Sequence, residues 1–313
     1  MHASNDNTHK DNGKSLDTVP KRRSLIVSAG ASCFVSCPGC YNYFKGPLAG
    51  TRTLVEFIYA CKQELELTKV TIGGGDPLTR RDIVHFLAAL KQLDLRIHLD
   101  TVGTAFIGVA QVNFMGSGTV SQIDPCSIRD LVDLVGIPID GSSDVIQQKF
   151  RKNLMVNSQV KILRALETAE IPVCANTVVH RGNFTDLSRI LDIIGRFKNV
   201  CRWQLFHFMP IGPLGHKNRH LFDLDTGLFQ EACTKIAHLV PRHIIFEPKN
   251  HARRKNRYLL IDGRGDLWIP VQSNKSVWRS DEDATDERRV IGHISDADIF
   301  NRIKQLEFDQ PCE

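Results

Sequence analysis

The chain has 313 residues, of which 42% are hydrophobic, enough to bury one large core or a core with a small appendage. Its formal net charge of +5 is mild for this length and does not by itself indicate a nucleic-acid partner. Its nine cysteines are an odd number, which argues against a disulfide framework and favours a reducing, cytoplasmic setting.

The chain begins with a polar segment, residues 1–23, which lacks the apolar stretch of a secretion signal and which we expect to be a disordered arm. No later stretch approaches the ~20 uninterrupted apolar residues needed to cross a bilayer. After the arm, short apolar runs alternate with helical patterns. The predicted strands are 24–30, 69–75, 96–100, 133–139, 172–179 and 202–209. The predicted helices lie near 54–67, 80–93, 159–169 and 184–197, with Thr79 and Asp82 as a capping-box-like start of the second.

This alternation predicts an α/β fold in which parallel strands are joined by crossover helices. Six strand–helix units are too few for an eight-stranded barrel, so we expect an open, partial (β/α)6 barrel. Residues 104–126 show no clear period and are a candidate lid or insertion. Short candidate strands at 243–246, 258–261 and 267–269 come before a last helix near 296–308. We therefore divide the chain into the arm (1–23), the barrel (24–215) and a small β/α extension (216–313) that completes or caps the barrel.

Three cysteines lie close together in the loop after the first predicted strand, in the run Cys33-Phe-Val-Ser-Cys37-Pro-Gly-Cys40. A loop with Pro and Gly can turn three thiolates inward around a metal centre. No further cysteine lies within twenty residues of Cys40, so one iron of a four-iron cubane would lack a protein ligand. By analogy with open zinc sites, such a vacancy marks a catalytic centre. Three alternatives stay open: a structural zinc site with a distant fourth ligand, a redox pair of Cys37 and Cys40, and an accidental cluster of core cysteines.

At these residues the sequence resembles the radical S-adenosylmethionine (SAM) superfamily, whose signature is the same CxxxCxxC spacing. The resemblance covers roughly residues 24–215. It implies that Cys33, Cys37 and Cys40 hold a [4Fe–4S] cluster whose open iron binds SAM. It also implies a flavodoxin- or ferredoxin-like electron donor, reductive cleavage of SAM and a 5′-deoxyadenosyl radical that abstracts hydrogen from a substrate. Many members carry an aromatic residue just before the third cysteine, where it touches the adenine. Here Gly39 stands at that position, and Tyr41 is the candidate replacement.

The resemblance implies further SAM contacts at the ends of the predicted strands. The run Gly73-Gly74-Gly75-Asp76-Pro77 is similar to the family's GGE(P) motif, which binds the amino group of SAM, with Asp in place of Glu. Taken alone, such a run is a plain turn after a strand. The remaining candidates are polar or adenine-contacting residues at the next strand ends, namely Thr101, Asp140, Asn176, Gln204 and Met209. The alternative is that the polar ones simply satisfy backbone groups at the barrel mouth.

The resemblance is greatest to small-molecule members of the family, which implies an oxidoreductase or lyase that acts on a small, anionic biosynthetic molecule. Its candidate substrate contacts are His180, Arg181, His207 and Arg253. Residues 249–257 form a basic cluster that is either an anion-binding rim or a solvated loop. No second cysteine cluster follows residue 215, so we expect a single iron–sulfur cluster. A peptide or protein substrate is the alternative within the enzyme class. A metal-stabilised nucleic-acid-binding or structural protein is the alternative outside it, and nucleic acid is disfavoured because aromatic residues do not interleave the basic cluster.

Overall fold

The computed structural model describes residues 23–42, 48–250, 259–270 and 288–306. Of the predicted arm only Arg23 falls in this range, as the first residue of a strand. The predicted contact Arg253 and most of the basic cluster lie outside the described residues. None of the described helices is both long enough and apolar enough to cross a membrane.

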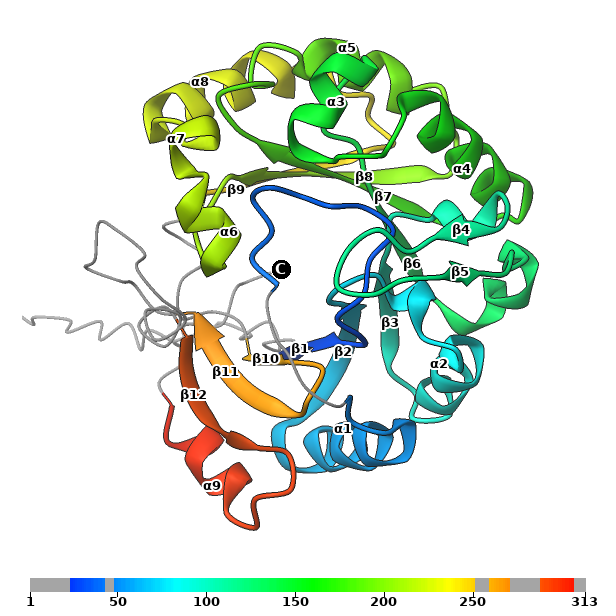
Figure 1. Ribbon diagram of the computed structural model, residues 1–313, viewed down its shortest axis with the longest axis vertical. Coiled ribbons are helices and arrows are strands. Elements are labelled where there is room, and N and C mark those ends of the chain that lie inside the picture. Colours follow the sequence, from blue (N-terminus) through cyan, green and yellow to red (C-terminus); the bar gives the residue numbers. More distant parts are fainter. Residues whose placement is uncertain (1–22, 43–47, 251–258, 271–287, 307–313) are drawn as a thin grey trace, which may run out of the picture.

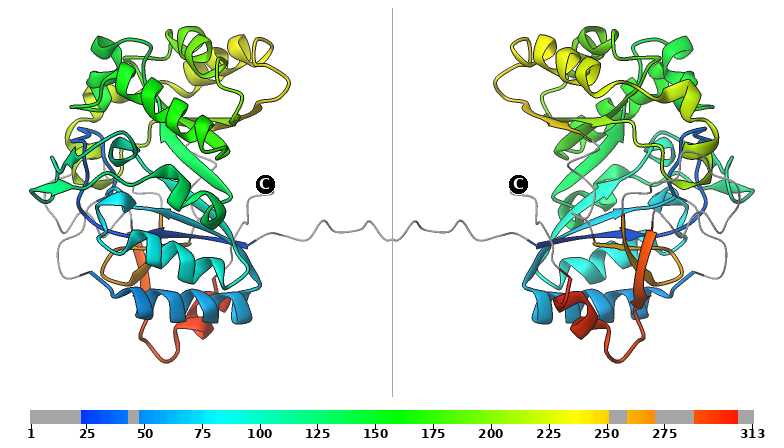
Figure 2. Two further views of the ribbon diagram at one scale, coloured as in Figure 1. Left: turned by 90° about the vertical axis from the view of Figure 1, so that its right-hand side faces the viewer. Right: turned by 90° about the vertical axis from the view of Figure 1, so that its left-hand side faces the viewer.

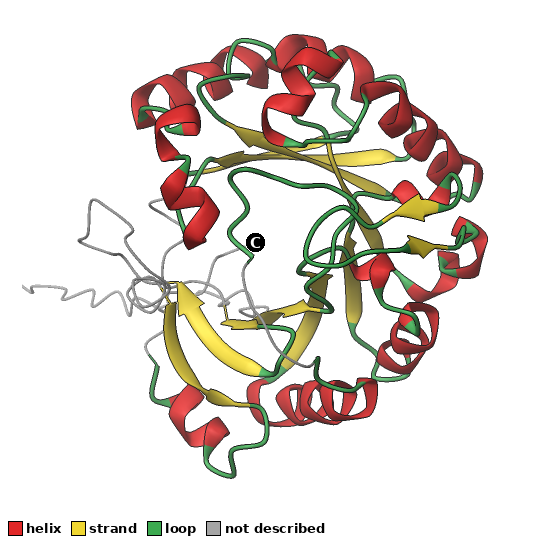
Figure 3. Cartoon of the chain, viewed as in Figure 1, coloured by secondary structure: helices red, strands yellow, loops and turns green. Residues whose placement is uncertain are grey.

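A curved, mostly parallel sheet of ten strands forms the centre of the molecule (Figures 1 and 3). In order across the sheet, the strands are β12 (Arg288–His293), β11 (Asp266–Pro270), β10 (Leu259–Ile261), β1 (Arg23–Ser28), β2 (Leu67–Gly73), β3 (Arg96–Asp100), β6 (Leu134–Pro138), β7 (Val173–Val179), β8 (Val200–His207) and β9 (Ile245–Lys249). The strands from β10 to β9 pair in parallel, whereas β11 and β12 are antiparallel to their neighbours. The order has two ends among the described strands, so the sheet is open, as predicted for a partial barrel.

Helices cover the outer face of this sheet (Figures 1 and 2). The described helices are α1 (Thr51–Leu65), α2 (Ile83–Lys91), α3 (Asp144–Phe150), α4 (Val156–Thr168), α5 (Leu187–Ile194), α6 (Gly212–Lys217), α7 (Arg219–Phe222), α8 (Thr226–Ala237) and α9 (Ile299–Lys304). Of these, α6 lies beside the cysteine loop and not on the outer face (Figure 1), and the amide of Asn218, the residue after it, donates to the Pro38 carbonyl at 2.8 Å. The helix α5 shows why helices pack on the outer face: its buried residues recur at the spacing of one helical face, namely Leu187, Ile190, Leu191 and Ile194.

Side chains alternate along the strands between this helical layer and the concave inner face. On β3, Ile97 and Leu99 are fully buried, and His98 and Asp100 point to the other side, where they line a cavity. The sheet therefore has an apolar outer face that forms the core and an inner face that carries polar groups.

The six predicted strands are confirmed to within a few residues, and the third has the predicted bounds. The predicted helix start at Thr79 is wrong, because α2 begins at Ile83. Thr79 instead ends a short 3-10 turn (Pro77–Thr79), and its hydroxyl donates to the Asp76 carbonyl at 2.7 Å. Asp82 makes no capping bond and pairs with Arg80 at 2.7 Å. The prediction also missed α3, the three helices α6 to α8, and β12.

Residues 104–126 form an insertion between β3 and β6 that includes a two-stranded ribbon, β4 (Ala110–Gln111) and β5 (Thr119–Val120). The segment next to this ribbon pairs with the cysteine loop: the Cys33 N–H donates to the Phe114 carbonyl at 2.9 Å, and the Asn113 N–H donates to the Cys33 carbonyl at 2.9 Å. At the two sides of the sheet, β9 extends the β8 edge and β10 to β12 extend the β1 edge. The insertion thus supports the cysteine loop. The division of the chain at residue 215 stays a prediction.

Candidate functional site

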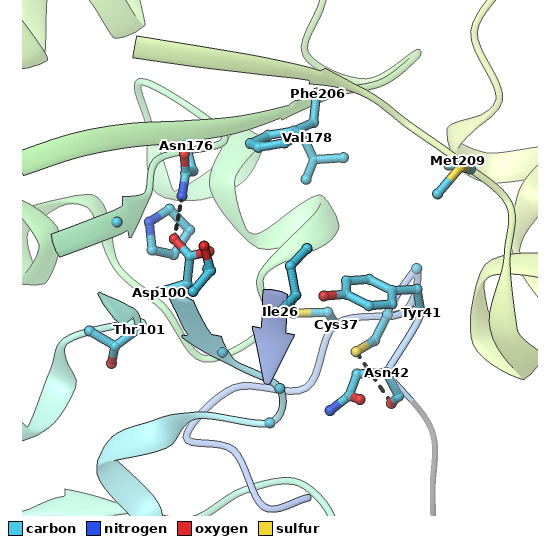
Figure 4. A pocket seen from close by; sticks show the side chains of 18 of the residues that line it. Ile26, Cys37, Tyr41, Asn42, Asp100, Thr101, Asn176, Val178, Phe206 and Met209 are labelled. Carbon is cyan, nitrogen blue, oxygen red and sulfur yellow. Dashed lines mark hydrogen bonds between the residues drawn. The ribbon is translucent and has the colours of Figure 1, made fainter. Parts of the chain in front are cut away.

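A cavity of about 330 Å³ lies inside the curve of the sheet. The three cysteines of the loop after β1 line it, together with residues from the ends of β2, β3, β7 and β8 (Figure 4). Ligands of parallel α/β sheets bind just beyond the carboxyl ends of the strands, and this cavity begins there.

The cysteine loop is held in place by its backbone and is largely shielded from solvent. Cys33 and Cys37 are buried and Cys40 is half-buried. The Cys40 N–H donates to the Cys37 carbonyl at 3.1 Å, and the Asn113 amide donates to the Phe34 carbonyl at 2.7 Å. Burial raises the pKa of all three thiols, that of Cys40 to about 12. Binding a metal centre must therefore release protons from these residues.

The donor set, three soft thiols on one loop, is compatible with an iron–sulfur cluster. Within the described part of the chain, no three His, Cys, Asp or Glu side chains are placed to hold one metal ion as they stand. The thiols are still close enough for the charges of Cys37 and Cys40 to raise the Cys33 pKa further. Zinc draws its sulfur ligands to about 2.3 Å from a single atom, whereas a four-iron cluster is larger and holds its thiolates farther apart. Soft sulfur ligands on one loop, facing one cavity, fit such a cluster.

Arg151, the residue that follows α3, brings a positive charge to the thiols. Its Nη1 lies 3.6 Å from Cys37 Sγ, and its Nε donates to Asp140 Oδ2 at 2.5 Å. Burial lowers the Arg151 pKa, but the charges of Asp140 and Cys37 outweigh this effect and hold it above its ordinary value. Arg151 lines the cavity, and Asp140 stands behind it, fully buried, and also accepts the Val178 N–H at 2.6 Å. The sequence pointed to Asp140 and missed the arginine that this carboxylate holds in place.

The glycine run after β2 docks on the cysteine loop. Gly73, Gly74 and Gly75 all line the cavity. The Gly75 N–H donates to the Gly30 carbonyl at 2.8 Å, and a Cβ on Gly75 would overlap the Ser32 carbonyl oxygen. Close approach of two backbones is thus one reason for glycine here.

Asp76 and Pro77 are buried and do not line the cavity. The Asp76 carboxylate accepts the Thr101 hydroxyl and the Val102 N–H, both at 2.7 Å, and the Leu78 N–H at 2.9 Å. These bonds tie the end of β2 to the end of β3. Contact of Asp76 with a cofactor stays a prediction, and its carboxylate as placed is occupied by the protein itself.

The other predicted residues divide into two groups. Tyr41, Thr101, Asn176, Gln204, His207 and Met209 line the cavity, whereas His180 and Arg181 do not. His180 is buried and stacks on Phe150 with ring centroids 5.4 Å apart, and burial lowers its pKa to about 3. It is therefore neutral and packs the core. Contact of these residues with SAM or substrate stays a prediction.

The aromatic surface missing at Gly39 comes from elsewhere in the chain. A Cβ at Gly39 would lie 2.5 Å from Phe150 Cε2 and 2.8 Å from Phe208 Cε2. Both rings line the cavity, as does Tyr41. A side chain at position 39 would displace these two rings, which accounts for glycine at the position where the resemblance leads one to expect an aromatic residue.

Sequence reasoning missed three charged or titratable residues on the inner wall, namely Lys69, His98 and Asp100. Lys249, which also lines the cavity, belongs to the predicted basic cluster. Asp100 is joined to the predicted residue Asn176, whose amide donates to Asp100 Oδ1 at 2.9 Å (Figure 4). The sequence did contain a signal for two of the missed residues. His98 and Asp100 occupy positions i and i+2 of one predicted strand and therefore lie on the same face.

Comparison with known proteins supports the family suggested by the cysteines. The family model described as "Radical SAM superfamily" matches residues 27–193, more than half of the chain. The PqqA peptide cyclase of Streptomyces rochei is 23% identical over 178 residues, which are 54% of this chain and 44% of that protein. The PqqA peptide cyclase of Granulibacter bethesdensis is 24% identical over 180 residues, 56% of this chain and 45% of that protein. The chain thus spans about half the length of these relatives.

Solved structures share the fold at low sequence identity. SuiB of Streptococcus suis bound to S-adenosylmethionine has a TM-score of 0.59 and 11% identity, covering 79% of this chain and 59% of that one. The structure of anSMEcpe with bound AdoMet and Cp18Cys peptide has a TM-score of 0.59 and 15% identity, covering 91% and 80%. At these identities the likeness concerns the fold alone.

Proposed function

Since the chain belongs to the Radical SAM superfamily, we propose that it is an enzyme that modifies a peptide or protein substrate. Proteins similar to this chain support the substrate class: two are PqqA peptide cyclases by name, and SuiB and anSMEcpe have been crystallised with peptides. A peptide is therefore preferred to the small anionic molecule that the sequence suggested.

One cavity that joins the three thiols to a polar inner wall is the observation that carries the proposal. Its volume of about 330 Å³ is near the lower end of the range for small-ligand pockets. We propose that one side chain or one chain end of a longer substrate enters this cavity, which the residues that would hold the cluster also line.

When bound, the [4Fe–4S] cluster and SAM supply the radical chemistry of this family, the 5′-deoxyadenosyl radical that removes a hydrogen atom. The chain's own residues have simpler tasks. Cys33, Cys37 and Cys40 hold the cluster, and the Arg151 guanidinium offsets negative charge beside it. Phe150 and Phe208 present apolar surface that keeps water from the reacting atoms. The sheet holds these groups at fixed positions around the substrate.

The proposal is tested with anaerobically purified protein that has been reconstituted with iron and sulfide and reduced with dithionite in place of the physiological donor. Formation of 5′-deoxyadenosine from SAM is followed by chromatography, with Cys37→Ala as the inactive variant and Cys61→Ala, a buried core cysteine, as the matched control. Peptides encoded beside the gene are then added and weighed by mass spectrometry. A SAM- and Cys37-dependent mass change supports the proposal. If only small metabolites accelerate SAM cleavage, the peptide assignment is wrong and the small-molecule alternative stands.

A further inference from the structure

The inner wall carries a carboxylate that the cysteine site does not use. Asp100 is the last residue of β3 and lines the cavity away from Cys37, as Figure 4 shows. Its Oδ1 accepts the Asn176 amide at 2.9 Å and lies 3.3 Å from His98 Nε2. Its side chain keeps 39% exposure, whereas that of His98 keeps 7%. Asn176 and His98 thus hold the carboxylate on the side of the sheet, and its other side is exposed to the cavity.

The three side chains can approach one another because the strand between them, β6, has a glycine at this position. Asp100 and His98 lie on β3 and Asn176 lies on β7, with β6 in between. Gly136 of β6 pairs in register with Asp100. A Cβ on Gly136 would overlap Asp100 Oδ1 and would lie 2.7 Å from Asn176 Nδ2 and 3.0 Å from His98 Nε2. Any residue other than glycine at 136 would push this cluster apart.

The arrangement keeps Asp100 ionised and supplies a hydrogen bond to only one of its two carboxylate oxygens. Burial raises the Asp100 pKa, but His98, Asn176 and Lys69 outweigh burial and hold it below its ordinary value. No described residue donates a hydrogen bond to Oδ2, and His98 Nε2 is buried without a well-aligned hydrogen-bond partner in the described part of the chain. A buried or confined charge of this kind is costly unless a partner reaches it. A carboxylate held by fixed donors on one oxygen is a prepared acceptor for a charged donor on the other.

The charge of Asp100 itself sets the sign of the donor that it would bind, although Lys69, Arg151 and Lys249 also line the cavity. Asp100 is the one acidic side chain among the described residues that line the cavity. Of the two lysines on the wall, Lys249 lies 3.8 Å from Glu247 Oε2, which also accepts the Gln204 amide at 2.8 Å. The other, Lys69, contributes to keeping Asp100 ionised. Next to Asp100, an entering carboxylate would be repelled, and a neutral amide would be bound less well than a cation.

We propose that Asp100 binds a cationic nitrogen of the peptide substrate, either the side chain of Lys or Arg or a free amino terminus. His98 and Asn176 are positioning residues, and Gly136 leaves the room that they need. The inference rests on the proposed peptide substrate, and it assigns the Asn176 amide to Asp100.

The test measures binding of four short peptides to the reconstituted, SAM-loaded enzyme by titration calorimetry. The probes are acetyl-Ala-Lys-Ala-amide, Ala-Ala-Ala-amide with its free amino terminus, acetyl-Ala-Gln-Ala-amide and acetyl-Ala-Glu-Ala-amide. Wild type should bind one of the first two at least ~10-fold more tightly than the Gln peptide, and which of them it prefers identifies the source of the cation. Asp100→Asn, which keeps the shape, should weaken the preferred peptide by about 10- to 100-fold. Asp130→Asn, a change at an exposed surface carboxylate, should alter nothing.

A second variant and the affinity for SAM separate substrate recognition from other roles. Gly136→Ala keeps the Asp100 charge but displaces it, so it should lose the same preference while iron content stays at the wild-type level. If Asp100→Asn weakens SAM binding and leaves the ratio of Lys to Gln peptide unchanged, the carboxylate serves the cofactor and the inference is overturned. Equal binding of all four peptides to wild type overturns it as well.

Failure of the proposed function gives a different result. If no peptide binds, methylammonium and methylguanidinium are titrated in the same way. Binding of either cation to wild type that is lost in Asp100→Asn supports the receptor and refutes only the peptide. Absence of binding by both cations refutes the receptor.

Discussion

Substitution of Gly75 by Ala should displace the cysteine loop, whereas the same change at Gly73, two residues earlier, should not. A Cβ on Gly75 overlaps the Ser32 carbonyl oxygen and lies 2.6 Å from the carbonyl carbon and oxygen of Ala31. These are backbone atoms and cannot rotate away as the end of a side chain can. At Gly73 the nearest atom is Asp100 Cβ at 3.7 Å, an ordinary contact. The two variants are therefore a matched pair within one motif.

The magnitude follows from what holds the two loops together. The Gly75 N–H donates to the Gly30 carbonyl at 2.8 Å, and the Asp76 N–H donates to the Ser32 carbonyl at 2.6 Å. The added methyl either strains the packed loops, at about 1–3 kcal/mol, or separates them and breaks both bonds, at about 1 kcal/mol each with a further cost for groups left unpaired. We expect Gly75→Ala to lower the free energy of unfolding by about 2–4 kcal/mol and Gly73→Ala to stay within about 1 kcal/mol of wild type.

Urea unfolding of the metal-free protein measures the first effect. Iron content after anaerobic reconstitution measures the displacement of the cysteine loop. Ser32 directly precedes Cys33, and the loop must keep its shape to hold a cluster. Gly75→Ala should bind much less iron, and Gly73→Ala should bind the wild-type amount. Equal stability and equal iron content in the two variants would refute the reasoning.

Three further predictions concern other parts of the site. Cys37→Ala should abolish iron binding in a colorimetric assay, and Cys61→Ala, a core cysteine, should retain it. Arg151→Met leaves the fully buried Asp140 carboxylate unpaired and should cost about 3–5 kcal/mol of unfolding free energy in urea, part of which a second change, Asp140→Asn, should restore. Burial raises the Asp76 pKa from 3.8 to about 6, against the hydrogen bonds that lower it. Because the folded-state pKa lies above the unfolded one, about 3 kcal/mol of stability should be lost as pH rises from about 4 through 6, and Asp76→Asn should flatten this dependence in urea unfolding at pH 4.5 and pH 7.

The cysteine site could be predicted because its residues are neighbours in the chain. The spacing of Cys33, Cys37 and Cys40 is a local pattern, and so is the strand that delivers the loop. The strands were predictable for a similar reason, since each is a short apolar run bounded by turn residues. The helices α1, α2, α4 and α5 were predicted from their apolar faces, although the predicted start of α2 was wrong by a few residues.

Arg151 shows where local patterns stop. It follows α3, which has only seven residues and is too short to show a helical period. Its partner Cys37 is 114 residues away in the chain. Nothing near residue 151 in sequence reports this contact, which depends on how the chain folds over the cysteine loop. The helices α6 and α7 are shorter still, with six and four residues, and they were missed for the same reason.

The polar inner wall lies between these two cases. A parallel strand buried on both faces is expected to be an almost continuous apolar run, yet in β3 His98 and Asp100 alternate with the fully buried Ile97 and Leu99. Polar groups on one face of such a strand are costly unless they are paired, so the alternation itself indicates a lined cavity and could have been recognised. What the alternation does not contain is the strand order β3, β6, β7, which places a glycine between Asp100 and Asn176 and allows them to touch. The polar residues of the inner wall can thus be predicted for each strand separately, whereas the contacts between them depend on the strand order of the folded sheet.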